Sequence, residues 1–116
     1  MVRLLDAANR LSRSSSTVED AIRIYLDLAE EGLLIALTSL GYLYVNPPPN
    51  SIESDLDRAK HYYEIAADFG EPLAKFNLAQ LYRNEGRYAE ADELLRQSAE
   101  AGFADAEAAL ETGEEE

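Results

Sequence analysis

The chain repeats one pattern of apolar and polar positions three times. Counted from Ala21, Ala59 and Ala91, the positions three, four, seven and eight residues later carry mostly apolar or small side chains. Because an α-helix makes one turn in about 3.6 residues, these positions lie on one face of a helix. Each copy therefore predicts an amphipathic helix. Apolar residues with helical spacing in segment 2–12 predict one more helix before the first copy.

A glycine follows each of these alanines at a distance of eleven residues, and a second apolar pattern begins almost directly after it. The glycines are Gly32, Gly70 and Gly102. Glycine has no Cβ atom and accepts the positive φ that often ends a helix, while Pro72 suits the first turn of the next helix. About seven helices are therefore expected, as pairs over 2–31, 33–69 and 71–101 and a terminal helix over 103–112.

Small side chains at fixed places in these helices indicate close packing between helices. Two helix axes approach to about 8–10 Å, and the short end of that range requires small residues where the helices cross. Larger leucine and tyrosine side chains would then fill the flanks of each contact. The predicted contact points are Ala29, Ala36, Gly41, Ala67, Ala74, Ala79 and Ala99.

The two connections between the copies differ in length and composition. Segment 45–59, VNPPPNSIESDLDRA, contains three consecutive prolines, which neither adjoining helix could accommodate, and it is predicted to be a loop. Segment 84–91, NEGRYAEA, predicts a tight turn between two helices. Two serine–acid pairs resemble capping boxes that would start the following helices, Ser54 with Asp57 and Ser16 with Glu19.

Segment 74–99, AKFNLAQLYRNEGRYAEADELLRQSA, is similar to a tetratricopeptide repeat. Its signature spacing is occupied by Leu78, Ala79, Tyr82, Gly86, Tyr88, Ala91 and Ser98. Segment 55–82 resembles the Sel-one-like (Sel1-like) branch of that family, and the match spans about residues 21–110. Tyrosine replaces the usual tryptophan, and Glu111 stands where a small residue is expected. The resemblance implies an all-α fold, a right-handed α-α superhelix formed by a short solenoid of antiparallel helix pairs.

Repeat proteins of this family usually offer the concave face of the array to a partner protein or peptide. On this chain the corresponding positions are Thr38, Tyr42, Val45, Asn46, Leu73, Phe76, Asn77, Gln80, Arg83 and Asn84. The amide side chains there could bond a peptide backbone, and the aromatic rings could anchor apolar side chains. An ordinary half-polar helix face is the alternative interpretation. Arg83 is the one basic residue in this set, which disfavours a ligand bound through its terminal carboxylate.

Composition and charge exclude several classes of protein. The chain has 116 residues, no cysteine and a formal charge of −13, and residues 51–116 hold six basic against seventeen acidic side chains. Such a chain repels phosphate backbones and anionic lipid surfaces, so neither a nucleic acid nor a membrane is expected as partner. We find no apolar run of signal-peptide or membrane-span length and expect a cytoplasmic protein.

Residue types with metal or cation chemistry are present at two places. His61 and Glu64, three residues apart, could reach one metal ion. A solvated helix face is the better interpretation, because the chain has no second histidine. Asp55 and Asp57 could bind a cation but fall in the first turn of a helix, where carboxylates interact favourably with the helix dipole.

Three further segments have a functional and a structural interpretation. Ser14–Ser16 could accept phosphate after the basic NRLSR segment, but a linker that ends in a helix cap is favoured. Pro47–Pro49 has the extended conformation that some binding modules recognise, but a rigid loop is favoured. The acidic tail 113–116 is expected to be disordered.

We find no nucleophile with a histidine–acid partnership and no glycine-rich phosphate loop, so no enzyme, cofactor or metal protein is expected. The first hypothesis is a non-catalytic adaptor or scaffold that binds a protein or peptide. The second is a terminal fragment or self-associating module of a longer array, with self-association through Phe103, Ala106, Ala109 and Leu110 of the terminal helix. The third is an acidic protein that neutralises a basic partner.

Overall fold

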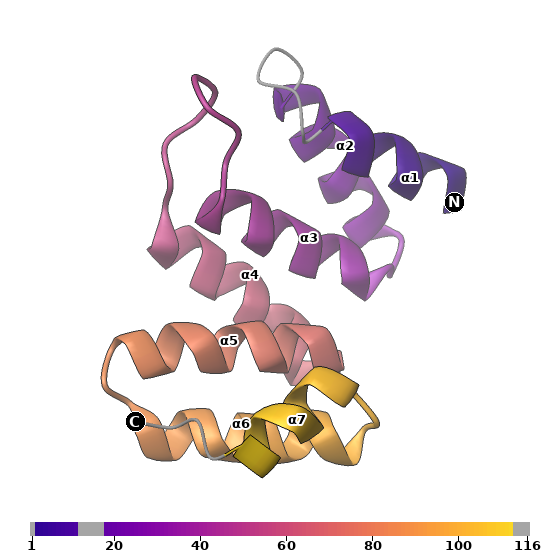
Figure 1. Ribbon diagram of the computed structural model, residues 1–116. Coiled ribbons are helices and arrows are strands. Elements are labelled where there is room, and N and C mark those ends of the chain that lie inside the picture. Colours follow the sequence, from indigo (N-terminus) through magenta and orange to yellow (C-terminus); the bar gives the residue numbers. More distant parts are fainter. Residues whose placement is uncertain (1, 12–17, 113–116) are drawn as a thin grey trace. The chain divides into compact units, whose positions relative to one another are not determined.

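The computed structural model describes residues 2–11 and 18–112, which form seven α-helices and no β-strand (Figure 1). The all-α repeat fold expected from the sequence is confirmed. The helices are α1 (Val2–Leu11), α2 (Val18–Glu30), α3 (Leu34–Val45), α4 (Leu56–Asp68), α5 (Pro72–Asn84), α6 (Tyr88–Glu100) and α7 (Ala104–Thr112).

The chain divides into two compact units, Met1–Tyr62 and Tyr63–Glu116, and the division falls inside α4. The expectation of one continuous domain over residues 1–112 stays a prediction. The acidic tail 113–116 lies outside the described residues.

In the N-terminal unit, α1 packs on α2 and α2 packs on α3. Ala21, Leu28 and Ala36 are almost fully buried between these helices. The Tyr25 hydroxyl group, itself buried, donates a hydrogen bond to the side-chain oxygen of Asn9 and so ties α2 to α1.

The proline-containing connection between α3 and α4 is a loop, as predicted, and its two ends are held together. The Asp55 backbone amide donates to the Tyr44 carbonyl oxygen at 2.9 Å. The Tyr44 ring stacks on Tyr62 with 6.0 Å between ring centroids, and the Arg58 guanidinium lies 5.2 Å from the Tyr44 centroid. These contacts fix the first turns of α4 against the end of α3.

In the C-terminal unit, α5 packs on α6 and α6 packs on α7. A buried cluster joins the three helices through Ala79, Ala91, Leu95 and Ala106. The fully buried hydroxyl of Ser98 on α6 donates to the Pro72 carbonyl oxygen of α5 at 2.9 Å, so this polar group keeps its hydrogen bond inside the core.

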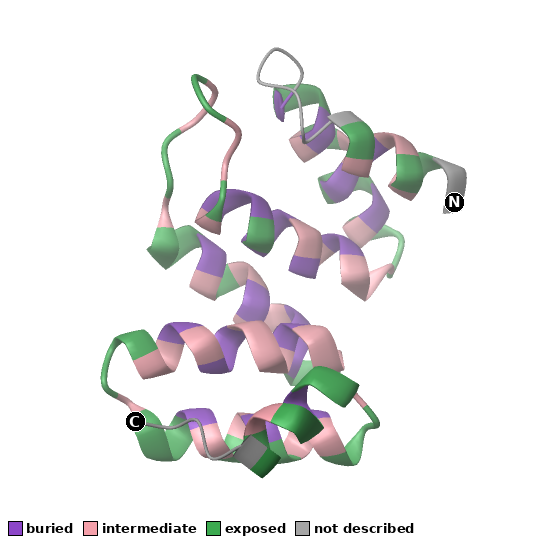
Figure 2. Ribbon diagram, viewed as in Figure 1, coloured by how far each residue is buried: buried purple, intermediate pink, exposed green. Residues whose placement is uncertain are grey.

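Five of the seven predicted contact points are buried, which confirms the packing role of most small residues. Figure 2 shows such buried positions along the helices of both units. The remaining two, Ala29 and Ala99, are half-buried. The buried ones are Ala36, Gly41, Ala67, Ala74 and Ala79.

Helices α2, α4 and α6 end just before the predicted glycines. Gly70 has a φ of 92° between α4 and α5, and Gly32 and Gly102 have nearly the same value in the corresponding turns. Pro72 is the first residue of α5, as expected, and the Glu71 carboxylate accepts hydrogen bonds from the Leu73 and Ala74 amides at 3.1 and 3.0 Å.

The predicted cap of α4 was wrong by one residue. Asp55, not Ser54, accepts a hydrogen bond from the Arg58 backbone amide, at 3.0 Å, while the Ser54 hydroxyl donates to the Val45 carbonyl oxygen. Both residue types are good N-caps, so composition alone does not separate them. The second proposed capping residue, Ser16, lies outside the described residues.

The terminal-helix residues expected to mediate self-association are partly covered within the C-terminal unit. Ala106 is fully buried, and Phe103 and Ala109 pack against the buried cluster that α5 and α6 form. Leu110 is the exception, with 38% of its surface exposed. Self-association itself stays a prediction.

Candidate functional site

The predicted partner-binding positions divide between the two units, and each set is described separately. On α3, Tyr42 exposes 59% of its surface, and Asn46, the residue that caps the end of α3, is also exposed. Thr38 exposes only 1%, so its side chain belongs to the interior and offers no surface here. The α3 set therefore reduces to Tyr42 and Asn46, with half-buried Val45 between them.

The α5 set lies along one side of that helix. Leu73, Asn77, Gln80 and Arg83 are half-buried, and Asn84 at the end of α5 is exposed. Among the described residues, the side chains of Asn77, Gln80 and Arg83 have no hydrogen-bond or ion-pair partner. Their donors and acceptors are therefore available to a partner.

Phe76, the predicted aromatic anchor on α5, packs within the C-terminal unit, so its ring is not a free surface group. Its centroid lies 5.3 Å from that of Phe103, with an angle of 55° between the two rings. Both rings pack against the buried cluster of the C-terminal unit. Because tilted aromatic pairs of this kind stabilise the fold, Phe76 contributes to holding α7 in place.

A surface that the sequence did not predict lies elsewhere in the C-terminal unit. A groove of about 430 Å³ is lined by the last turns of α4, by α5 and by α6. Ala67 and Leu78, both buried, form part of its apolar lining together with half-buried Tyr82 and Leu94. None of the predicted partner-binding residues lines it.

The charged residues of the groove are mostly acidic. Four carboxylates line it, Glu64 and Asp68 from α4 and Glu90 and Glu93 from α6, against the single ammonium group of Lys75. Asp68 has no ion-pair or hydrogen-bond partner in the part of the chain that the structure describes. The groove is therefore partly apolar and is lined by more acidic than basic side chains.

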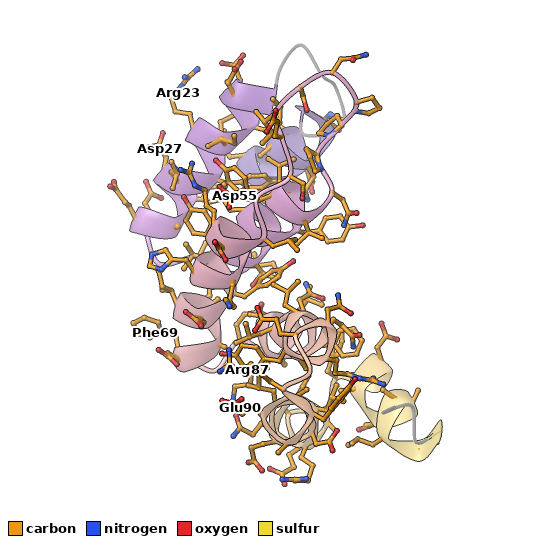
Figure 3. All side chains as sticks on the ribbon, turned by 90° about the vertical axis from the view of Figure 1, so that its left-hand side faces the viewer. Arg23, Asp27, Asp55, Phe69, Arg87 and Glu90 are labelled. Atoms are coloured by element: carbon orange, nitrogen blue, oxygen red, sulfur yellow. The ribbon has the colours of Figure 1, made fainter. Side chains whose placement is uncertain are left out.

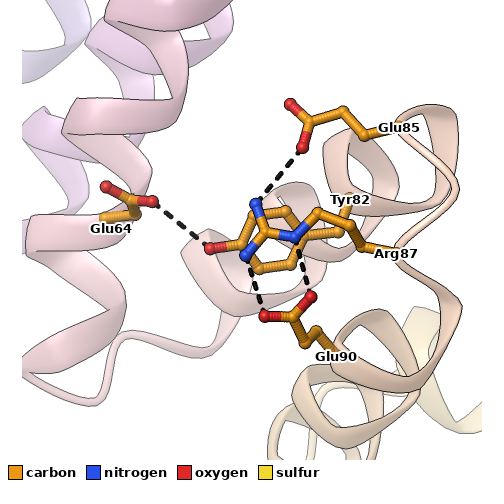
Figure 4. Close-up of polar contacts among 5 residues, drawn as sticks. All are labelled: Glu64, Tyr82, Glu85, Arg87 and Glu90. Carbon is orange, nitrogen blue, oxygen red and sulfur yellow. Dashed lines mark hydrogen bonds and ion pairs between the residues drawn. The ribbon is translucent and has the colours of Figure 1, made fainter.

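One end of the groove is built around Tyr82 (Figure 4). The Arg87 guanidinium lies 3.9 Å from the Tyr82 ring centroid and donates to both carboxylate oxygens of Glu90, at 2.7 and 2.8 Å. It also donates to Glu85 at 3.3 Å, and the Tyr82 hydroxyl donates to Glu64 at 3.3 Å. This network fixes the orientation of two groove carboxylates, Glu64 and Glu90.

The same contacts set the protonation of these groups. Burial raises the pKa of the Tyr82 hydroxyl, and the nearby Glu64 carboxylate raises it further, so the phenol stays neutral. Hydrogen bonds from Arg87 lower the pKa of Glu90 below its ordinary value. Hydrogen bonds from Gln97 and then Arg96 lower the pKa of Glu93 in the same way. Both α6 carboxylates are thus held in the charged state.

The candidates for metal chemistry gain no support. His61 is exposed, and its ring centroid lies 6.0 Å from that of Tyr62, with the two rings tilted to each other. Asp55 is the N-cap of α4 described above. Within residues 2–11 and 18–112, we find no group of three histidine, aspartate or glutamate side chains placed to hold a metal ion. Ser14–Ser16 lie outside the described residues. Each helix in the described segments is too short or too polar to span a bilayer.

Comparison with known proteins identifies the fold. No protein-family profile matches the chain, and no curated protein matches it. Among solved structures, the crystal structure of a Sel1 repeat protein from Oxalobacter formigenes superposes with a TM-score of 0.74. The fold is that of a Sel1 repeat protein. The Sel1-like match covers 89% of this chain at 23% identity and 44% of the Oxalobacter chain, so this chain spans less than half of that protein's length.

The Sel1-like resemblance inferred from packing residues is thus confirmed for the fold. The groove was missed because its signal is spread over three helices. Glu64 and Asp68 are four residues apart on α4, and Glu90 and Glu93 are three apart on α6, spacings that place each pair on one helix face. That both faces line one groove follows only from the packing of α4, α5 and α6.

Proposed function

We propose that this chain is a non-catalytic adaptor or scaffold module that binds a protein or a peptide. Stacked helical repeats build extended surfaces that such proteins use for binding. The alanines that recur in each repeat pack between helices, and the recurring glycines end helices. Recognition of a partner therefore depends on the residues that differ between repeats. We also propose a cytoplasmic setting, in keeping with a cysteine-free chain.

The observation that carries this proposal is the α5 surface around Asn77 and Gln80. Each amide side chain offers two donors and one carbonyl acceptor, the same groups that an extended peptide backbone presents. Both side chains are partly exposed and have no partner among the described residues. A bound backbone would satisfy these groups without displacing an existing contact.

Exposed Tyr42 on α3 supports the proposal in the other unit. An amphipathic ring with 59% of its surface exposed can bury an apolar side chain of a partner while its hydroxyl stays hydrated. Tyrosine is also among the residue types that dominate binding energy at protein interfaces.

The test begins with affinity capture from native extract and continues with calorimetry on the purified partner. We expect the double variant Asn77→Ala/Gln80→Ala to lose about tenfold in affinity, since each lost hydrogen bond is worth about 0.5–1.5 kcal/mol. Glu100→Ala is the control, because this exposed side chain lies outside both the α5 surface and the groove. Unchanged affinity of a folded double variant, or an equal loss in Glu100→Ala, would remove the α5 surface as the binding site.

A further inference from the structure

The acidic groove of the C-terminal unit is open to solvent and does not enclose a ligand. Its volume is about 430 Å³. It would admit a few side chains of a partner, but not a whole helix face. Its apolar part is aliphatic for the most part, through Ala67, Leu78 and Leu94.

The α4 wall of the groove carries two carboxylates that form no ion pair in the described part of the chain, and Lys75 of α5 is the one basic residue that lines the groove with them. Glu64 and Asp68 are four residues apart on one helix face, an arrangement in which like charges repel. Glu64 receives a hydrogen bond from a neutral phenol, and Asp68 has no partner within the described segments. A cation at this wall would relieve the repulsion.

The α6 wall differs, because its carboxylates have partners of their own. Glu90 is paired with Arg87, and Glu93 is paired with Arg96 and bonded by Gln97. These pairs are exposed and contribute little to attraction for a ligand. The carboxylates without an ion pair therefore lie on one side of the groove, next to the aliphatic lining.

We propose that this groove binds a short segment of a partner protein that carries an arginine beside an aliphatic residue. The guanidinium would meet Glu64 and Asp68, and the aliphatic side chain would lie on Leu78 and Leu94. Arginine suits this wall better than lysine, because its planar fork can bond two carboxylates and its weaker hydration lowers the cost of entering a groove. Anionic ligands such as nucleic acids are repelled by the same charges.

The groove shares no residue with the α5 surface proposed above, so the two proposals can fail independently. The face around Asn77 and Gln80 selects a peptide backbone, whereas the groove selects a charged side chain. A partner that used both would be held by two separate sets of contacts.

The probe is a labelled pentapeptide, acetyl-Gly-Leu-Arg-Leu-Gly-amide, titrated into the full chain and followed by methyl NMR. Its control replaces the arginine with citrulline, which has nearly the same shape but no charge. We expect the arginine peptide to shift the methyl signals of Ala67, Leu78 and Leu94 and to bind about tenfold more tightly than the citrulline peptide. Equal binding of the two peptides, or shifts confined to other helices, would overturn the proposal.

A pair of variants separates the groove from the general acidity of the chain. Glu64→Gln/Asp68→Asn removes the charge of the α4 wall, while the amide oxygen introduced on α4 can still accept the Tyr82 hydrogen bond, and it should reduce affinity for the arginine peptide about tenfold. Glu100→Gln/Asp105→Asn removes the same charge from exposed positions outside the groove and should change affinity less than about twofold. Equal losses in the two variants would show non-specific attraction and would overturn the proposal.

Discussion

Alanine at the helix crossings is the residue on which the packing of both units depends. A buried alanine contributes little apolar area of its own, but it lets the neighbouring helix approach closely enough for larger side chains to interlock. Ala74 on α5 is fully buried, close to the Pro72 carbonyl that receives the Ser98 hydrogen bond. Because Ala74 is fully buried, a larger side chain there would have to displace neighbouring atoms.

The first prediction concerns this position. Ala74→Leu should lower the free energy of unfolding by about 1–3 kcal/mol, because extra methylene groups in a packed core force neighbouring side chains and backbone to shift. Urea unfolding followed by circular dichroism measures the change. Ala108→Leu, the same substitution at an exposed position of α7, should stay within about 0.5 kcal/mol of the wild type. A loss as large at Ala108 would contradict the packing explanation.

Arg87 is the residue that links the aromatic and acidic parts of the groove. It stacks on Tyr82 and pairs with Glu90, and Figure 3 shows Arg87 and Glu90 close together beside the packed helices of the C-terminal unit. Its charge keeps the Glu90 carboxylate ionised at pH values where a free carboxyl would begin to take up a proton.

The second prediction follows from this pair. Arg87→Gln should raise the pKa of Glu90 toward its ordinary value of 4.5. A carboxyl whose pKa is lower in the folded protein adds stability that is present above the unfolded pKa and is lost as pH falls through the folded pKa. The variant should therefore lose less stability on acidification than the wild type. Carbon-detected NMR titration gives the pKa directly.

Glu93 is the internal control for that titration. Its pKa is lowered by Gln97 and Arg96, not by Arg87, and should stay where it is in the variant. A parallel rise of both carboxyl pKa values would point to a general structural change and would contradict the local explanation.

At the scale of the element, the start of α4 shows how one side chain fixes a helix boundary. The Asp55 carboxylate accepts the Arg58 amide, and its own amide donates to the Tyr44 carbonyl oxygen. One residue thus ends the loop and begins the helix. The flanking serine contributes a hydrogen bond to the loop instead.

The third prediction separates the two candidate caps. Asp55→Ala should cost about 0.5–2 kcal/mol of stability, the usual cost of losing an N-cap side chain. Ser54→Ala should cost less than about 0.5 kcal/mol, since its bond to the Val45 carbonyl is long and exposed. Asp55→Asn keeps the cap and should retain most of the stability. Thermal unfolding of the three variants decides; a larger loss in Ser54→Ala would restore the original assignment.

Helices and turns could be predicted from the sequence because the repeat shows the same local signals three times. Gly70 adopts the positive φ that glycine accepts easily, and Pro72 lies in the first turn of α5, where its missing amide hydrogen costs no hydrogen bond. Both signals are local in sequence. The burial of Thr38 could not be predicted, because the family resemblance assigned it to the partner-binding set and burial depends on packing around α3, not on a local signal. The groove depends on side chains of α4 and α6 that meet only after packing.

At the scale of the whole molecule, net charge is the dominant property. The formal charge of −13 is concentrated in residues 51–116, and the described ion pairs are exposed contacts between close neighbours in sequence. Such pairs stabilise little, whereas the excess of like charge opposes the compact state. Mobile ions screen that repulsion.

The fourth prediction is that salt stabilises this protein. The urea midpoint should rise between about 0.01 and 0.15 M sodium chloride, as the screening length falls from about 30 to 8 Å. Glu100→Lys/Asp105→Lys, which brings the formal charge from −13 to −9 because each substitution changes it by two, should show a smaller rise. Glu100→Asp/Asp105→Glu keeps the charge and should respond like the wild type. A midpoint that falls with salt would contradict the prediction.

The hydrogen bond between Asp55 and Tyr44 has a practical consequence for the loop that it closes. Because this bond and the Tyr44–Tyr62 stack fix the loop ends, the stretch around Asn50 can change in length without moving either helix. Doubling the length of a flexible loop costs only about 0.6 kcal/mol. An epitope tag or a protease recognition sequence spliced after Asn50 would therefore provide a handle on this protein while both chain ends remain unmodified.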